Sequence, residues 1–394
     1  METFLKVLFW FSLFIPAYNY FGYAVIVYLA NKLFSPYKIT GLEPNFEPEV
    51  TLLIAAYNEE DFIREKIENC LQLNYPKEKL RIAFVTDGSS DLTPDIARSY
   101  PQVEVHHEPE RRGKAMAINR VMELITSPIV IFCDANTELN PDAVRLIVSH
   151  YSDPEVGGVS GEKKINPRYA TDSAGAGEGL YWKYESFLKK IDSEFYSVVG
   201  AAGELFSVRK NLYDPVEPDT ILDDFMISLR INKKGYRIIY EPNAFAMEDP
   251  SANIAEESKR KTRIAAGGFQ SIFRLLPLLN IFRYGRLSFL YTSHRVLRWL
   301  VTPFALALLI ITNVLLLGNY VPFSSVYGMI FWGQVLFYAG VVLGWINARR
   351  KGKIPVVNAL YYFAFMNISV YSGLAKYLGG RQSAMWQRSE RLRK

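Results

Sequence analysis

Long stretches without charged side chains lie at both ends of the chain and enclose a polar middle. Residues 7–31, 299–348 and 354–375 contain no Asp, Glu, Lys or Arg. Because a helix needs roughly 20 apolar residues to cross a bilayer, we expect a membrane helix over residues 7–33, kinked at Pro16. A cleaved signal peptide is the alternative, but this apolar run exceeds the usual core of about 7–15 residues.

The C-terminal apolar region, residues 299–376, is too long for one helix. Residues 299–348 fit a hairpin of two membrane helices that turns at 318–322, between Gly318 and Pro322. The third stretch, 354–375, contains Asn358 and Asn367, so it either spans the bilayer or lies at its surface. The turn has no basic residue, whereas the loop at 349–353 is strongly basic, so this loop and the polar middle should face the cytoplasm. Residues 377–394 form a basic tail.

Residues 267–298 join the polar middle to the hairpin and mix apolar with basic side chains. Within them, residues 269–286 carry Arg274, Arg283 and Arg286 among isoleucines, leucines and phenylalanines. This composition predicts an amphipathic helix on the cytoplasmic surface of the membrane. An ordinary surface helix of the polar region is the alternative.

The polar middle, residues 44–266, alternates short apolar runs with helical patterns. The apolar runs predict strands at 50–57, 80–86, 103–105 and 128–133, and the spacing between them predicts helices at 59–73, 93–99 and 114–125. Strands that are apolar on both faces and alternate with helices form parallel sheets covered on both sides. We therefore expect an α/β domain with a doubly wound, mostly parallel sheet.

Composition and charge exclude several functions. The net charge is only +5, and the basic residues cluster beside the apolar stretches, so we expect no nucleic-acid partner. The two cysteines, Cys70 and Cys133, exclude a disulfide framework. Neither a GxGxxG nor a GxxxxGK[ST] pattern follows the first strand, so dinucleotide binding and P-loop chemistry are unsupported.

Polar side chains follow the predicted strands at their carboxyl ends, where open α/β sheets bind ligands. Glu59 follows the first strand, Asp87 the second, and Asp134 with Asn136 the fourth. Because carboxylates repel phosphates, a diphosphate ligand here requires a divalent cation, and we expect Asp134 and Asn136 to bind Mg²⁺ or Mn²⁺ with it. The alternative is that Asp134 caps the next helix. The basic run 111–114 precedes a helix and is either a phosphate site or a solvated loop.

Five short motifs occur together in an order and spacing that one enzyme family shares. They are Ala55-Ala56-Tyr57-Asn58-Glu59-Glu60, Thr86-Asp87-Gly88-Ser89-Ser90-Asp91, Gly113-Lys114, Asp134-Ala135-Asn136-Thr137 and Leu222-Asp223-Asp224-Phe225. The chain resembles the family-2 inverting glycosyltransferases, which have the GT-A fold. With its apolar flanks it is similar to the membrane-integrated synthases of cellulose, hyaluronan, chitin and poly-N-acetylglucosamine. The resemblance covers about residues 5–394.

The resemblance implies a role for each matching residue. It implies a UDP-sugar donor bound by Tyr57, Glu59, Asp87, Lys114 and Asp134. It places Mg²⁺ or Mn²⁺ at Asp134 and Asn136, the general base at Asp224, and a cation that contacts the diphosphate at Arg263. It implies an acceptor side formed by Trp182, Gly203, Glu204, Asp223 and Arg260. The implied partners are a growing glycan or a lipid-linked acceptor, and membrane lipids.

An inverting transfer is a single displacement, which needs a base for the acceptor hydroxyl and positive charge for the leaving diphosphate. Like-charge repulsion between Asp223 and Asp224 would raise the pKa of one of the two and make it a better base. Paired acids also favour helix N-termini, which is the alternative reading of this pair. We expect the catalytic domain on the cytoplasmic side, with a bacterial plasma membrane as the simplest location.

Two positions depart from the pattern of the family. Asn136 stands where its DxD motif has a second Asp, and Ile264 stands where its QxxRW motif has a tryptophan. Because an isoleucine packs less well than a flat ring against a sugar, a transferase that adds one sugar to a lipid acceptor is an alternative function. A nucleotide-binding scaffold or transporter is an alternative of another class, against which the lack of ionisable residues in the apolar stretches argues. So few membrane helices would form a channel only in a homodimer or with a small membrane partner.

Overall fold

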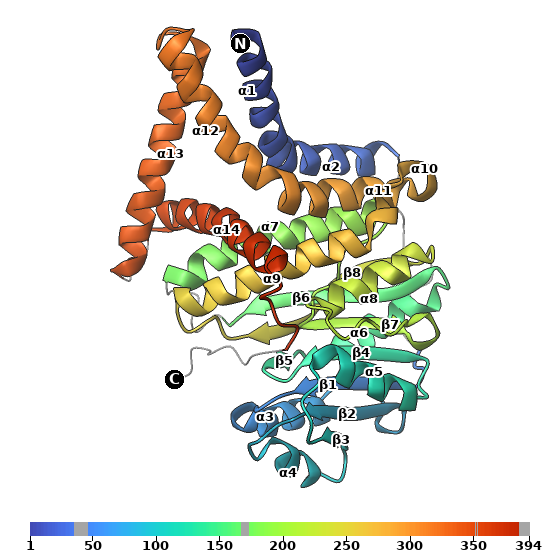
Figure 1. The fold of residues 1–394 in the computed structure, drawn as a ribbon. Helices are drawn as coiled ribbons and strands as arrows, with labels where there is room; N and C mark the ends of the chain where they lie inside the picture. The colour runs from blue at the N-terminus through green and yellow to red at the C-terminus, as the bar shows by residue number, and fades with distance from the viewer. Residues whose placement is uncertain (35–45, 167–172, 351, 353, 386–394) are drawn as a thin grey trace.

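The computed structural model describes residues 1–34, 46–166, 173–350, 352 and 354–385. An α/β domain occupies one end of the molecule, and three helices, α1, α12 and α13, extend from the other end (Figure 1). Several helices run across the molecule between these two parts (Figure 1). The predicted basic tail, 377–394, is described only as far as residue 385, and residues 351 and 353 of the basic loop lie outside the described residues.

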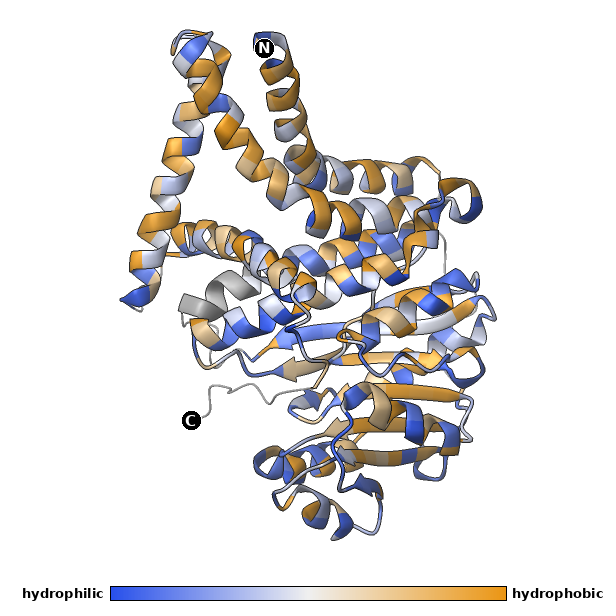
Figure 2. Cartoon of the chain, viewed as in Figure 1, coloured by the Kyte–Doolittle hydropathy of each residue, from blue (hydrophilic) through white to orange (hydrophobic). Residues whose placement is uncertain are grey.

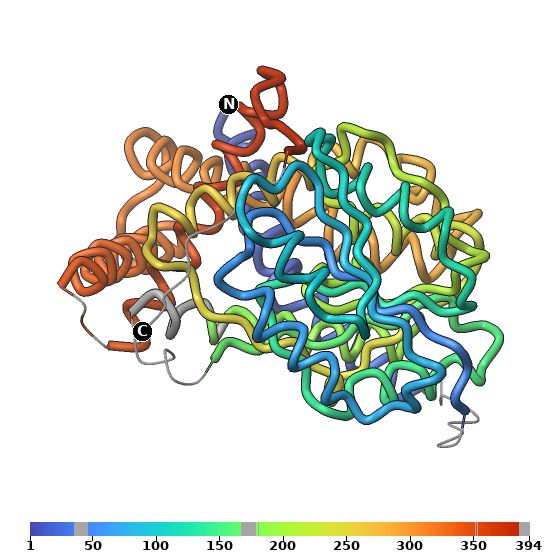
Figure 3. The backbone as a smooth tube through the Cα atoms, turned by 90° about the horizontal axis from the view of Figure 1, so that it is seen from below, coloured from blue at the N-terminus to red at the C-terminus, as the bar shows by residue number. Residues whose placement is uncertain are grey.

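The first half of the α/β domain matches the elements predicted from the sequence. Its elements are β1 (Val50–Ala56), α3 (Glu60–Leu71), η2 (Lys77–Lys79), β2 (Leu80–Asp87), α4 (Thr93–Arg98), β3 (Glu104–Glu108), α5 (Lys114–Leu124) and β4 (Ile129–Asp134). β1 pairs in parallel with β2 and β4, and β2 pairs in parallel with β3. The α/β fold class is therefore confirmed. Viewed from the end opposite the apolar helices, this half lies nearest the reader (Figure 3).

The second half extends the same sheet but changes strand direction. Its elements are β5 (Thr137–Leu139), α6 (Ala143–Ser149), η3 (His150–Ser152), β6 (Val156–Ile165), α7 (Ser173–Phe195), β7 (Leu205–Arg209), η5 (Lys210–Leu212), α8 (Asp223–Lys233) and β8 (Arg237–Glu248). The eight strands have the order β3-β2-β1-β4-β7-β6-β8-β5. β7 is antiparallel to both β4 and β6, and β5 is antiparallel to β8, whereas β6 and β8 are parallel.

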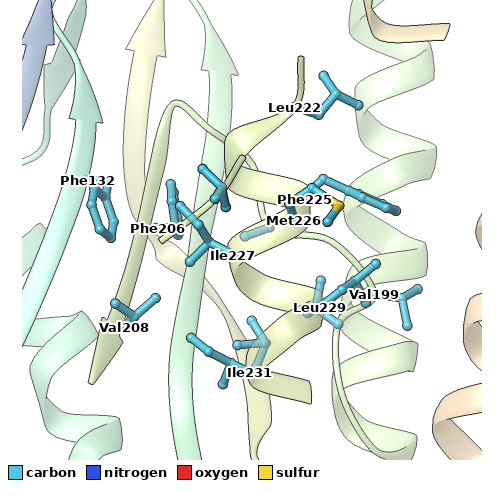
Figure 4. Close-up of a cluster of buried hydrophobic side chains, with 14 of the residues drawn as sticks. Phe132, Val199, Phe206, Val208, Leu222, Phe225, Met226, Ile227, Leu229 and Ile231 are labelled. Atoms are coloured by element: carbon cyan, nitrogen blue, oxygen red, sulfur yellow. The ribbon is translucent and has the colours of Figure 1, made fainter. Parts of the chain in front are cut away.

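Helix α8 is held against the sheet by its apolar face. Phe132 and Phe206 of the sheet face the helix, which contributes Met226, Ile227 and Leu229 to the same buried cluster (Figure 4). Burying side chains of this size stabilises the fold by roughly 1.5–3 kcal/mol each. This packing fixes the first turn of α8, where two acidic residues lie, at the edge of the sheet.

Helix α9 (Ile254–Arg274) crosses the expected domain boundary at residue 266 without a break. The side chain of Asn253 caps the helix by accepting a hydrogen bond from the backbone N–H of Glu256 at 3.0 Å. Residues 265–272 of the helix are buried, and α14 (Pro355–Leu378) packs alongside them. α9 therefore continues past the expected boundary as one helix, buried against α14.

The N-terminal apolar stretch forms two helices that meet at a bend. α1 (Glu2–Ala17) is followed by a single π-helical turn (η1, Tyr18–Gly22) and by α2 (Tyr23–Leu33), and the bend lies just after Pro16. α1 points away from the α/β domain, whereas α2 runs across it (Figure 1). The predicted kink is therefore confirmed.

The predicted C-terminal hairpin is also present. α12 (Thr302–Asn319) and α13 (Val326–Arg349) are joined by a short turn, and both are apolar along their length (Figure 2). The stretches Glu2–Leu33, Arg286–Asn319 and Val326–Arg349 are long and apolar enough to cross a membrane. α14, the stretch for which two readings were open, packs against α9 and α7 and runs across the molecule.

The segment at 269–286 differs from the single amphipathic helix predicted for it. α9 ends at Arg274 and is followed by η6 (Leu276–Leu279), α10 (Ile281–Tyr284), α11 (Arg286–Leu290) and the π-helical η7 (Tyr291–Val301). One interruption of the helix lies near Pro277, and another lies at Gly285, whose φ is +49°. Residues 269–272 are buried, whereas Phe273 at the end of α9 and the shorter pieces beyond it, with Leu276, Ile281 and Phe282, present apolar side chains to solvent.

Candidate active site

A cavity of about 690 Å³ opens between the edge of the sheet and the helices α7, α9 and α14. Most of the residues that the sequence predicts as functional line it. These are Glu59, Lys114, Asp134, Asn136, Trp182, Gly203, Glu204, Asp223, Asp224, Arg260 and Arg263. They come from separate strands, loops and helices of the chain, so the fold brings together residues up to about two hundred positions apart. Tyr57 and Asp87 are not among the lining residues.

Lys114 links two acidic groups on the sheet side of the cavity. Its Nζ lies 2.7 Å from Asp134 Oδ1 and 3.9 Å from Asp223 Oδ2. Burial lowers the pKa of Lys114, but the carboxylates of Asp134 and Asp223 outweigh it, and the pKa is raised overall. Lys114 therefore holds a positive charge beside the end of β4, and the N-cap of the next helix, α6, is Asp142 and not Asp134.

The pKa of Asp224 is raised to near neutral pH. Burial raises the pKa of Asp224 to about 7, and repulsion from Asp223 adds to this. Gly203 lies directly against it, since a Cβ on Gly203 would stand 3.0 Å from Asp224 Oδ2. Any larger residue at position 203 would crowd the carboxylate.

Asp87 and Tyr57 do not line the cavity but contact the loop before α5. Asp87 accepts hydrogen bonds from the backbone N–H of Arg112 at 3.0 Å and of Gly113 at 2.6 Å. The ring of Tyr57 lies under the guanidinium of Arg111, 3.7 Å from the ring centroid. Both residues therefore hold the basic loop that leads into α5 and Lys114.

Next to Asn136, on the same side of the cavity, a buried lysine lies between two glutamates. Lys163 Nζ is 2.7 Å from Glu204 Oε1 and also pairs with Glu248. Although burial raises it, the pKa of Glu204 is held below its ordinary value by Lys163. Asn136 Nδ2 donates to Glu248 Oε1 at 3.4 Å, which connects this group to the metal position predicted from the sequence.

The sequence analysis missed Lys163 and Glu248, although a signal was present. Both lie on strands at positions that continue a row of buried residues, Lys163 after Val159 and Gly161, and Glu248 after Ala246. A charged residue on the buried face of a strand requires a partner. The alternation of buried and exposed positions along the two strands could therefore have identified both residues.

The two arginines of α9 that line the cavity differ in their partners. Arg260 pairs with Glu257, with Nε 3.0 Å from Oε2. Within the described part of the chain, the recorded hydrogen-bond partner of Arg263 is the carbonyl of Ile221, at 3.5 Å. The guanidinium of Arg263 could therefore bind an anion in the cavity.

The side chains that line the cavity are too dispersed to form a metal site alone. Among the described residues, no group of three or more His, Cys, Asp and Glu side chains could hold a metal ion. Asp134 and Asn136 offer a carboxylate and an amide oxygen, which are ligands that hard cations prefer. Any cation there needs further oxygen ligands from a bound molecule.

Comparison with known proteins assigns the domain. Residues 51–216 match the model of "Glycosyl transferase family 2". These residues form a glycosyl transferase family 2 domain. The matched region contains the sheet-side residues up to Glu204, and Asp224, Arg260 and Arg263 follow it in the chain.

Relatives of this family 2 domain include named synthases. The chain is 30% identical over 239 residues to the poly-beta-1,6-N-acetyl-D-glucosamine synthase of Staphylococcus aureus strain MSSA476, a match that covers 57% of this chain and 56% of that protein. It is 24% identical over 365 residues to the synthase of the same name from Staphylococcus epidermidis, covering 88% of this chain and 84% of that protein. The strongest of these matches thus spans little more than half of the relative.

A solved structure shows the same architecture over nearly the whole chain. A mannosyltransferase from Pyrobaculum calidifontis in complex with GDP-Man and Mn²⁺ superposes with a TM-score of 0.70. It covers 95% of this chain and 99% of its own, at 22% sequence identity. The α/β domain therefore has the GT-A-like fold of that protein. The superposition covers nearly the whole chain, so it includes apolar helices as well.

Proposed function

We propose that this protein is a membrane-bound inverting glycosyltransferase that transfers a sugar from a UDP-sugar to a hydroxyl of a growing glycan. The observation that carries the proposal is that Asp224, with its pKa near neutrality, opens into the same cavity as the Lys114–Asp134 pair. A carboxylate of that pKa is matched to proton abstraction at physiological pH. The cations beside it are matched to a leaving diphosphate.

The proposed reaction is a direct displacement. The acceptor hydroxyl oxygen attacks the anomeric carbon, its proton passes to Asp224, and the bond to the diphosphate oxygen breaks on the opposite face. Lys114 and Arg263 stabilise the negative charge that develops on the diphosphate. Gly203 leaves room for the acceptor beside Asp224. UDP release from a panel of UDP-sugars, compared with the Asp224→Asn variant, tests this proposal.

A divalent cation fits the sheet side of the cavity. Asp134 and Asn136 supply oxygen ligands of the required kind, and the mannosyltransferase of the same fold is a complex with Mn²⁺. When bound there with the donor, Mg²⁺ or Mn²⁺ would neutralise charge on the phosphates. Asp134 and Asn136 would hold it, and Lys114, 2.7 Å from Asp134, would add positive charge for the phosphates.

Metal removal should abolish UDP release. Excess EDTA should lower the rate to background, and added Mg²⁺ or Mn²⁺ should restore it, because the two protein ligands cannot hold the donor against carboxylate repulsion alone. Asn136→Asp replaces a neutral ligand by a charged one and should lower the half-saturating metal concentration several-fold. Full activity in EDTA would contradict the metal assignment.

The reaction should lose rate on the acidic side of neutrality. Because the base must be unprotonated and the pKa of Asp224 is raised to about 7, kcat/KM should fall about tenfold per pH unit below pH 7 and level off above it. An aspartate with its ordinary pKa would keep its activity to about pH 5. Initial rates between pH 5 and 9 check this, and a flat profile down to pH 5 would contradict it.

The relatives suggest the donor and product. The staphylococcal proteins are named as synthases of poly-β-1,6-N-acetyl-D-glucosamine, so UDP-N-acetylglucosamine is the first donor to test. Addition of one sugar to a lipid acceptor is the second candidate, favoured by the apolar lining of the cavity at Ile264, Met366 and Val370. Product length distinguishes them, since a polymerase makes long chains and the alternative adds one residue.

The proposed location is a membrane, with the α/β domain in the cytoplasm. α1, α12 and α13 would cross the bilayer, and the short helices after α9 would lie at its surface. Phe282 is 99% exposed and stands next to Arg283, a pairing suited to the boundary between acyl chains and anionic headgroups.

A further inference from the structure

The loop between α7 and β7, residues 196–204, packs against the first turn of α8. Gly203 of this loop lies against the carboxylate of Asp224, as described above. Gly200, whose φ is +96°, leaves room for the ring of Phe225, because a Cβ at Gly200 would stand 2.4 Å from that ring. The loop therefore covers both Asp224 and the residue that follows it.

A pair of hydrogen bonds joins the same loop to the backbone of α8. The backbone N–H of Ala201 donates to Ser228 Oγ at 3.0 Å, and the Ser228 hydroxyl donates to the carbonyl of Asp224 at 2.8 Å. Connected hydrogen bonds inside a protein hold their groups in one arrangement. The position of Asp224 therefore depends on where the loop lies.

Arg295 of η7 holds the start of this loop. Its side chain is largely buried, and its Nε donates to the carbonyl of Val199 at 2.7 Å. Its guanidinium also pairs with Glu185 of α7, with Nη1 2.7 Å from Oε1. Because a guanidinium is planar and carries several donors in a fixed geometry, it can bind a carboxylate and a carbonyl at once. Arg295 therefore joins η7, α7 and the loop before β7.

The segment that carries Arg295 belongs to the apolar part of the chain. η7 continues directly into α12 within Arg286–Asn319, a stretch long and apolar enough to cross a membrane. His294 Nδ1 lies 2.6 Å from Asp192 Oδ2 of α7, and the hydroxyl of Tyr23 on α2 donates to Oδ1 of the same carboxylate at 2.5 Å. A buried polar network thus fixes η7 between α7 and the N-terminal apolar segment.

We propose that Arg295 is a positioning residue for the general base. By holding the carbonyl of Val199, it keeps the loop 196–204 against Asp224, so that the geometry of the base depends on the apolar segment that carries Arg295. Arg295 lines the cavity, but the recorded contacts of its guanidinium within the described residues are with the protein. A loosened loop would admit water beside Asp224 and misalign the acceptor hydroxyl. This inference rests on the proposed function.

Replacing Arg295 by methionine should lower the rate of UDP release without weakening UDP binding. The full-length protein in phosphatidylcholine nanodiscs is given UDP-N-acetylglucosamine, and UDP binding is measured by calorimetry. We expect kcat to fall about tenfold to a hundredfold, because a misplacement of about 1 Å can cost about 10²-fold in rate. The dissociation constant of UDP should stay within about twofold, since Arg295 contacts the loop rather than the sheet-side residues.

The pH profile gives a readout that loss of stability alone would not move. Because burial raises the pKa of Asp224 to about 7, water admitted by a loosened loop should lower it toward that of an ordinary aspartate. The acidic limb of kcat/KM should then move to lower pH by about one unit. Losing the positive charge of Arg295 would by itself raise this pKa and move the limb to higher pH, so the direction of the shift separates the two effects.

The other charged groups around Asp224 are the same in all these variants. They are Asp223 of the same helix, Lys114 of α5, Glu204 at the end of the loop, and Arg263 of α9, which lines the same cavity.

Arg298→Met is the matched control. Arg298 lies three positions farther along η7 and pairs with the same carboxylate, with Nη1 2.9 Å from Glu185 Oε2, but among the described residues no hydrogen bond to the loop is recorded for it. Both methionine variants lose a buried ion pair, so both should lower Tm, whereas only Arg295→Met should move the pH profile. Arg295→Lys keeps the charge but not the planar fork, and should shift the limb in the same direction with a smaller loss of rate.

Three results would overturn the assignment. They are an unchanged kcat and pH profile in Arg295→Met, a limb that moves to higher pH, and an equal shift in Arg298→Met. If Arg295→Met does not fold, Arg295→Lys decides the question by the same criteria. A wild type that releases no UDP from any UDP-sugar would instead overturn the proposed function, and the assignment with it.

Discussion

Replacing Asp224 by asparagine should lower kcat by about 10²–10⁴ with little change in donor affinity. General-base catalysis is typically worth this much, and Asn keeps the shape of the side chain but cannot take a proton. The change also removes the repulsion between Asp223 and Asp224 that, with burial, raises the pKa of the wild-type carboxyl to about 7. The variant should therefore melt at the same temperature as the wild type or above it.

UDP-release kinetics, calorimetric UDP binding and thermal unfolding together check this expectation. A loss of rate with retained UDP binding and retained stability identifies Asp224 as a catalytic group. Asp142→Asn, a change at an exposed aspartate before α6, is the matched control and should behave as the wild type. Turnover by Asp224→Asn within about threefold of the wild type would remove Asp224 from the mechanism.

Replacing Lys163 by methionine should destabilise the protein by about 3–5 kcal/mol. The side chain of Lys163 is fully buried between Glu204 and Glu248, and breaking a buried ion pair by removing one partner typically costs this much. Methionine fills a similar volume but leaves two carboxylates without their cation. The pKa of both carboxyl groups should rise, so the difference from the wild type should shrink as the pH falls and the carboxyls take up protons.

Thermal unfolding in detergent at pH 8 and at pH 5.5 measures both effects. Lys164→Met is the matched control, because Lys164 is the next residue along β6 but is exposed. It should shift Tm little, since surface substitutions are usually within about 0.5 kcal/mol. Equal melting temperatures for Lys163→Met and Lys164→Met would show that the buried lysine does not compensate the two glutamates.

The sequence was sufficient to predict the parallel half of the domain. Each strand from β1 to β4 is a short apolar run followed by a helical pattern, so its structure follows from local periodicity. The strands β6, β7 and β8 were not placed, because their pairing depends on distant segments. β7 joins the two halves by pairing antiparallel with β4 and β6, which no local pattern reveals.

The candidate site was predictable where it follows from a rule of topology. Glu59, Asp134 and Asn136 were expected together because the ends of parallel strands meet at one edge, and all three line the cavity, whereas Asp224 was expected only from the resemblance to the family. Asp87 follows the same rule, yet its carboxylate accepts the backbone N–H groups of the loop before Lys114. The sequence does not show that the loop before Lys114 folds back to donate these hydrogen bonds to Asp87.

The acceptor side was the least predictable part. Ile264 stands on α9 where the family has a tryptophan, and Trp299 of η7 contacts the same helix one turn farther along, at Gly268. The two residues are 35 positions apart in the chain and meet only because η7 packs against α9. Lys163 and Glu248 carry a signal in the alternation of buried positions, but their contact with each other exists only because β6 pairs with β8.

The anomeric configuration of the product tests the central claim most directly. A single displacement with Asp224 as base requires the new glycosidic bond to have the configuration opposite to that in the donor. With UDP-N-acetylglucosamine, whose sugar is α-linked, the anomeric proton of the newly added residue should show the coupling constant of a β-linkage by NMR. An α-linked product would mean retention, and would contradict direct displacement by an acceptor activated at Asp224.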